Sequence, residues 1–212
     1  MGATCESLST FSQPPSPTAS ASLAGARQSG GGPHVAVSLA QTVGAGQFTM
    51  PNGRAGRGSN PFANLQAFCR VAATLTPSSD SDIKVEIWLP AAGWNGKLQA
   101  VGNGAWAGTI SYPAMATALA AGYATVSTDT GHAGGNANFM VGHPEKLKDF
   151  EERAVHEMTV TAKKIVAAYY DTPLKAPLPT AWNFPFQPAA GSQTSILMSE
   201  SPVGASVAAT RQ

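Results

Sequence analysis

Hydrophobic and polar positions alternate over residues 83–87, where apolar side chains are separated by Lys84 and Glu86. A period of two is typical of a strand with one buried face, and Pro90 is expected to end this strand. A second strand is predicted over 97–101. It leads into the glycine-rich stretch LQAVGNGAWAG at 98–108.

The residues after that stretch predict a helix and a third strand. Pro113 lies where a helix would begin, residues 114–121 favour a helix, and Gly122 is placed to end it. Residues 123–129, YATVSTD, are β-branched and mostly apolar, as in a buried strand. Because a strand, a helix and a strand form a βαβ unit, we expect the strands at 97–101 and 123–129 to be parallel.

A longer periodic segment covers 151–170 and predicts a helix packed on the sheet. Its apolar residues recur at spacings of three and four: Val155, Met158, Ala162, Ile165, Val166 and Tyr169. These patterns indicate an α/β fold class, with a mostly parallel sheet and flanking helices.

Charge density divides the chain into three parts, with four charged residues in 1–60, 17 in 62–170 and four in 171–212. We expect a folded domain over 62–170. Segment 1–61 is partly low-complexity, and segment 171–212 contains six prolines. Such sequence buries little apolar surface, so disorder is expected in both terminal segments.

Composition argues against nucleic-acid and membrane partners. The net charge is +1 and only 12% of residues are charged, whereas nucleic-acid surfaces and polybasic membrane patches need clustered Lys and Arg. No apolar run approaches the length of a membrane span. The first 30 residues show neither a basic nor a long apolar region, so no signal peptide is visible.

The two cysteines, Cys5 and Cys69, allow two interpretations. They are either unrelated buried thiols, which pack as small hydrophobic groups, or a disulfide joining the N-terminal segment to the start of the core. A disulfide would imply an oxidising compartment.

The glycine-rich stretch allows several interpretations besides a structural turn. Dinucleotide binding requires a Gly-x-Gly-x-x-Gly spacing that this stretch lacks, although Asp129 lies at a suitable distance. A phosphate-binding loop would need Gly-Lys-Ser or Gly-Lys-Thr, which is absent. The third interpretation is the oxyanion loop of an α/β-hydrolase, in which backbone amides face the charge that develops on the substrate.

Residues 66–170 closely resemble the N-terminal part of the catalytic domain in the tannase and feruloyl esterase family of serine esterases. The resemblance rests on the long stretches DIKVEIWLP, WNGKLQAVGNG, STDTGH and RAVHEMT. CESL at 5–8 and AQTVGAGQFTMP at 40–51 also resemble parts of the family's N-terminal segment. A partial, truncated α/β-hydrolase fold is therefore expected.

The resemblance implies a secreted hydrolase of gallate or hydroxycinnamate esters of plant material, with a phenolic ester as its substrate. Gly104 and Ala105 would supply the oxyanion-loop amide, although the family usually has a second glycine where this chain has Ala105. Cys5 and Cys69 would form the family's N-terminal disulfide. The family's calcium ion belongs to a lid domain that this chain lacks, so no metal or cofactor is expected.

The family's catalytic triad is not found in this sequence. Its nucleophile lies in a Gly-Cys-Ser-x-Gly-Gly motif, but residues 171–212 contain no cysteine. The nearest match is Gly204-Ala205-Ser206-Val207-Ala208, and the last histidine, His156, precedes it. Because this fold orders its triad Ser, acid, His, no catalytic residue is assigned. Asp129 and His132, at the end of a predicted strand, are a weaker alternative.

We therefore expect a carboxylic ester hydrolase by resemblance that is inactive as this chain. The hypothesis is a truncated or altered product, in which the family sequence is lost after about residue 170 and between 17 and 39. The alternative is a non-catalytic remnant that binds an aromatic acid or glycan, with Trp94, Trp106 and Tyr112 able to stack on it. An NAD-dependent enzyme is disfavoured by the glycine spacing. The sequence assigns no oligomeric state.

Overall fold

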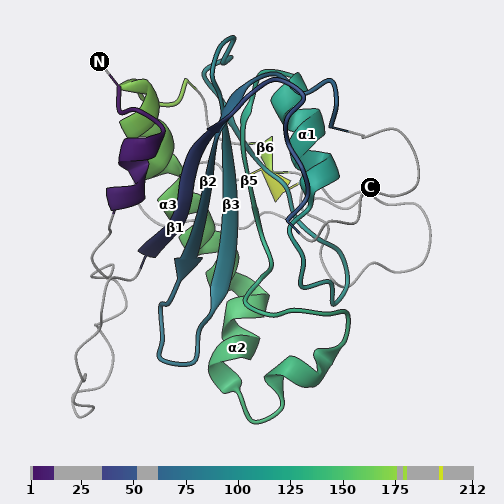
Figure 1. The fold of residues 1–212 in the computed structure, drawn as a ribbon. Helices are drawn as coiled ribbons and strands as arrows, with labels where there is room; N and C mark the ends of the chain where they lie inside the picture. The colour runs from purple at the N-terminus through teal and green to yellow at the C-terminus, as the bar shows by residue number, and fades with distance from the viewer. Residues whose placement is uncertain (1, 12–34, 52–61, 176–178, 181–195, 198–212) are drawn as a thin grey trace.

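A five-stranded sheet in the order β1-β2-β3-β5-β4 forms the centre of the protein (Figure 1). The structure is a computed structural model and describes residues 2–11, 35–51, 62–175, 179–180 and 196–197. The strands are β1 (Val35–Val43), β2 (Phe68–Leu75), β3 (Ile83–Pro90), β4 (Leu98–Ala100) and β5 (Ala124–Thr128). The short strands β6 (Pro179–Thr180) and β7 (Ile196–Leu197) form a separate antiparallel pair.

The predicted βαβ unit is confirmed. β4 and β5 are parallel, with Leu98 opposite Ala124 and Ala100 opposite Val126. The connection between them contains helix α1 (Tyr112–Ala120), which has Pro113 in its first turn. Gly122 follows the helix with a φ of +80°, a conformation that a residue without a Cβ adopts at little cost.

The α/β class is confirmed, but the expectation of a mostly parallel sheet is wrong. The pairs β1–β2, β2–β3 and β3–β5 are all antiparallel, so the sheet is mixed. The physical reason lies in the connections. Residues 76–82 join β2 to β3 directly, whereas a parallel pair needs a longer crossover, as the helix α1 provides between β4 and β5.

Helices cover both faces of the sheet. α3 (Ala154–Tyr170) buries Met158, Ala162 and Ile165 against one face, together with Leu8 of the 3₁₀ helix η1 (Glu6–Thr10). α1 covers the other face, where the second apolar core contains Phe48. α2 (Pro144–Lys148), the 3₁₀ helix η3 (Ala137–Met140) and a π-helical turn η4 (Asp149–Arg153) precede α3. The helix predicted over 151–170 is thus confirmed, with its first residues in the π-helical turn.

The N-terminal segment contributes to the same cores wherever it is described. Leu8 and Val35 are buried in the first core and Phe48 in the second. The disulfide between Cys5 and Cys69 is present and ties η1 to β2. The disorder expected in the terminal segments falls largely on 12–34, 52–61 and 176–212, which lie outside the described residues except for β6 and β7.

Candidate functional site

The glycine-rich loop lies at the carboxyl end of β4, where it leads into α1. β4 and β5 run parallel, so residues 129–132 after β5 emerge at the same edge of the sheet. This edge is where ligands bind in open α/β sheets. The two segments therefore define the candidate site.

Residues 104–107 of the loop form a tight turn. The amide of Ala107 donates to the carbonyl of Gly104 (N···O 3.1 Å), and the Asn103 side chain donates to the carbonyl of Ala107. Gly104 and Ala105 are exposed, and neither amide has an acceptor among the residues that the structure describes. Two unbonded amides in a tight turn suit an anion, and their assignment to an oxyanion stays a prediction.

We expect Ala105→Gly to stabilise the protein by about 0.5 kcal/mol. Ala105 has a φ of +49°, a left-handed conformation that costs a residue with a Cβ roughly 1 kcal/mol, part of which is offset by glycine's greater freedom in the unfolded chain. Urea unfolding measures the difference. Ala107→Gly, a neighbour without a positive φ, should instead destabilise; equal effects of the two substitutions would contradict the argument.

The loop packs against the segment that follows β5. His132 is buried, and its Nε2 lies 3.0 Å from the carbonyl oxygen of Trp106. The His132 ring stacks on Phe139 with a centroid distance of 3.8 Å, and Trp106 stacks on Phe150 at 5.0 Å. Aromatic contacts from η3 and η4 thus hold the loop in place.

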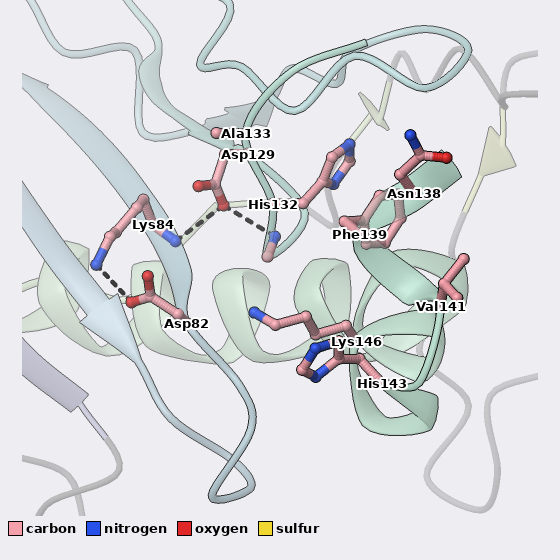
Figure 2. A pocket seen from close by; sticks show the side chains of 11 residues that line it. Asp82, Lys84, Asp129, His132, Ala133, Asn138, Phe139, Val141, His143 and Lys146 are labelled. Carbon is pink, nitrogen blue, oxygen red and sulfur yellow. Dashed lines mark hydrogen bonds and ion pairs between the residues drawn. The ribbon is translucent and has the colours of Figure 1, made fainter. Parts of the chain in front are cut away.

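A pocket of 480 Å³ is lined in part by the same segment after β5. Figure 2 shows Phe139 beside the His132 ring and Lys146 extending from α2 toward Asp82. The pocket is lined by Asp82, Lys84, Asp129, Gly131, His132, Ala133, Asn138, Phe139, Val141, His143 and Lys146. It combines both signs of charge with an aromatic wall, and so suits a small polar aromatic ligand.

Asp129 is the most perturbed carboxyl group of this pocket. Its Oδ1 accepts hydrogen bonds from the amides of Lys84 and Gly131, each at 2.9 Å. Burial raises the pKa of Asp129 to about 6, and these two hydrogen bonds oppose the rise. The carboxyl therefore titrates close to neutral pH in the folded protein.

Asp129→Asn is expected to remove a pH dependence of stability. Because the folded pKa lies above the unfolded value, the native state binds the proton more tightly, and wild-type stability falls as pH rises from about 4 to 7. The pKa of Asp129 rises by about two units, each worth about 1.4 kcal/mol, so the variant should be more stable near pH 7.5 by up to about 3 kcal/mol.

Urea unfolding at pH 4.5 and 7.5 measures this difference. Glu152→Gln changes an exposed carboxylate that does not line the pocket and serves as the control. If Asp129→Asn loses stability between these pH values as steeply as the wild type does, Asp129 is not the titrating group.

The other residues predicted to bind a ligand have packing contacts. Trp94 stacks on Tyr170 at a centroid distance of 3.7 Å, and Tyr112 packs beside Phe48 at 5.6 Å in the second core. Only Trp106 of the three aromatic candidates lies in the loop. His156 is exposed on α3.

Sequence reasoning missed several residues that line the pocket, because 137–148 shows no periodicity. Asn138, His143 and Lys146 come from η3, α2 and the residues between them. The signal present was Pro144, a helix-starting residue, directly after His143. His143 pairs with Asp80 at 3.0 Å.

No group of three His, Cys, Asp or Glu side chains among the described residues is placed to hold a metal ion. No helix in the described ranges is long and apolar enough to cross a membrane. The stretch Gly204–Ala208 lies outside the described residues.

Comparisons with known proteins give one consistent family. Residues 69–177 match the family model described as tannase and feruloyl esterase. An uncharacterized esterase of Xanthomonas campestris is 41% identical over 139 residues, which cover 65% of this chain and 23% of the esterase. A probable feruloyl esterase B-1 of Aspergillus oryzae is 37% identical over 115 residues, which cover 54% and 21%.

Solved structures share the fold. The crystal structure of feruloyl esterase B from Aspergillus oryzae matches with a TM-score of 0.62 and 28% identity, covering 84% of this chain and 31% of that one. A tannin acyl hydrolase from Aspergillus niger matches in fold with a TM-score of 0.50 and 19% identity, covering 69% and 28%. This chain spans less than a third of each of these relatives. Since the family model covers just over half of its residues, the chain belongs to the tannase and feruloyl esterase family.

Proposed function

We propose that this chain provides the oxyanion-binding part of a carboxylic ester hydrolase for hydroxycinnamate or gallate esters of plant material. The observation that carries the proposal is the pair of amides of Gly104 and Ala105, at the carboxyl end of β4 in a chain of this family, which have no acceptor among the described residues. Such a donor stabilises the transition state of ester hydrolysis by about 3 kcal/mol.

We further propose that the 212-residue chain does not hydrolyse esters by itself. Cys5 is followed by Glu6 and Cys69 by Arg70, so neither cysteine of the sequence belongs to a Gly-Cys-Ser-x-Gly-Gly nucleophile motif. His132 is engaged with Trp106, and His156 is exposed on α3. Without a nucleophile and base, an oxyanion site gives at most about a thousandfold to ten-thousandfold over water.

The test is an amide NMR titration of the ¹⁵N-labelled chain with ferulate and, separately, with its neutral ethyl ester. A carboxylate should shift the Gly104 and Ala105 amide resonances saturably, and the neutral ester should shift them much less, because the amides recognise negative charge. The absence of a saturable shift at both amides would overturn the oxyanion assignment. Saturable hydrolysis of ethyl ferulate by the chain would overturn its inactivity.

A second candidate function is binding of an aromatic acid without turnover. The pocket favours it, because its lining includes the aromatic ring of Phe139 and the cation of Lys146. In the same titration, this function would shift resonances of Phe139 and Lys146 while leaving Gly104 and Ala105 unmoved. The two functions are therefore distinguished by which residues respond.

We also place the protein in an oxidising compartment and propose that it is exported. The support is the buried disulfide between Cys5 and Cys69, since such bonds form and persist in oxidising environments. Fractionation of the producing cells under thiol-blocking conditions tests this location.

A further inference from the structure

Hydrogen bonds connect His132 to the amide of Ala105 through two peptide groups. The first is the peptide of Trp106 and Ala107, whose carbonyl oxygen lies 3.0 Å from His132 Nε2. Its N–H, on Ala107, donates to the carbonyl of Gly104 at 3.1 Å. The Gly104 carbonyl belongs to the second peptide, whose N–H is the amide of Ala105.

The direction of the Ala105 amide follows from this connection. A trans peptide is planar, and its N–H points away from its own carbonyl oxygen. Because the Gly104 oxygen faces Ala107 across the turn, the Ala105 N–H faces outward. Ala105 is exposed, so this end of the connection is open to a ligand.

We propose that His132 is a positioning residue for the oxyanion loop, orienting and polarising the Ala105 amide through these two peptides. A carbonyl that accepts a hydrogen bond makes the N–H of the same peptide a stronger donor, and successive bonds reinforce one another. The role assigned to His132 rests on the proposed function of the Ala105 amide, but the connection itself exists without any ligand.

The surroundings of His132 fix its ring. The ring is buried, stacks on Phe139 and meets Phe150 edge-on at 5.4 Å. The backbone on both sides is also held, because the Gly108 amide donates to the Gly134 carbonyl at 2.8 Å. A Cβ on Gly108 would lie 2.2 Å from the His132 carbonyl oxygen, so this close approach requires glycine. His132 is thus a rigid starting point for the connection.

Two measurements on the unmodified chain test the connection directly. Ring ¹⁵N shifts should show that His132 Nε2 carries a proton, because it must donate to Trp106. A coupling across the hydrogen bond should join the Ala107 nitrogen to the Gly104 carbonyl carbon. An unprotonated Nε2, or no such coupling, would overturn the proposal without any variant having to fold.

Two variants then separate the donor from the ring. His132→Phe keeps an aromatic ring against Phe139 but loses the N–H, whereas His132→Gln keeps an N–H donor of similar reach. We expect His132→Phe to speed exchange of the Ala107 amide about fivefold to tenfold, the effect of one lost hydrogen bond, and to shift the Ala105 resonance. His132→Gln should restore both. Equal behaviour of the two variants would mean that His132 has a packing role only.

Ligand titration keeps this outcome distinct from that of the proposed function. If ferulate does not shift Ala105 in the wild type, the oxyanion role fails, while the amide exchange still decides whether the connection exists. If ferulate binds the wild type, His132→Phe should weaken its affinity severalfold and His132→Gln should recover it. Unchanged affinity in His132→Phe would overturn the positioning role.

Discussion

Replacing Arg153 with methionine is expected to lower the free energy of unfolding by about 3–5 kcal/mol. Arg153 binds the carboxylate of Asp149, whose side chain is completely buried at the start of the π-helical turn. The other carboxylate oxygen of Asp149, Oδ2, has no hydrogen-bond partner among the described residues. Removing the guanidinium would therefore leave a buried charge without its counter-ion.

Arg153 also holds neighbouring elements together. Its Nη1 donates to the Glu145 carboxylate at 2.6 Å, and its Nη2 donates to the Glu145 carbonyl at 2.9 Å and to Ser81 at 3.2 Å. These bonds link α2 and the β2–β3 connection to the start of α3. Asp149 also packs against Gly131, where an added Cβ would lie 3.2 Å from the Asp149 Cβ. We therefore expect the loss of the Arg153 guanidinium to loosen the segment that carries His132.

Urea unfolding of Arg153→Met, Asp149→Asn, their double variant and one control variant tests this explanation. Arg153→Met should show the full loss, and the double variant Asp149→Asn with Arg153→Met should recover much of it, because no charge remains buried. Lys84→Met is the control, since its pair with Asp82 is exposed and worth less than about 1 kcal/mol. A double variant as unstable as the sum of its single variants would exclude the buried charge as the cause.

The parts of the fold predictable from sequence are those in which one local pattern decides the structure. Alternation over 83–87 gave β3, and the helical periodicity of 151–170 gave α3. The Pro113 and Gly122 boundaries gave α1 and with it the parallel pairing of β4 and β5. In each of these segments, local propensity and burial favour the same element.

The remaining strand pairings depend on contacts between distant residues. β1 and β2 pair antiparallel from Val35 opposite Leu75 to Val43 opposite Phe68, with a register shift between Val37 and Leu39. Residues 44–67 separate the two strands, and no local pattern predicts that they pair. β3 buries the charged Glu86 on the face of the second core, where Arg70 and Trp88 bond to it. A carboxylate is stable at such a core position only with hydrogen-bond partners of this kind. Arg70 lies on another strand, so the local sequence around Glu86 does not predict the pair.

The candidate site also combines features that the sequence predicts with features that it does not predict. The glycine-rich loop is visible in the sequence because glycines mark a turn, and the resemblance directs attention to Gly104 and Ala105. The connection from His132 begins with a hydrogen bond to the Trp106 carbonyl, 26 residues away in the sequence. No local pattern predicts a contact over this distance. The left-handed conformation of Ala105 is also invisible in sequence, because alanine rarely adopts it.

Removing the disulfide in Cys5→Ala with Cys69→Ala is expected to destabilise the protein by about 4 kcal/mol. The bond joins residues 64 positions apart, and closing a loop of this length restricts the unfolded chain by about that amount. Alanine leaves little change of volume at the two buried positions. The native fold should therefore persist, with its near-ultraviolet circular dichroism unchanged, while the urea midpoint falls.

The reduced wild type distinguishes the cross-link from the side chains. Its unfolding in dithiothreitol should match that of the double alanine variant within about 1 kcal/mol, because both lack the same constraint. Unfolding of the variant within 1 kcal/mol of the oxidised wild type would contradict the prediction. Since η1 contacts β1, and Glu6 accepts a hydrogen bond from Thr42 at 2.9 Å, amide exchange should rise first in these two elements. Local opening there would show that the bond secures the N-terminal segment to the sheet.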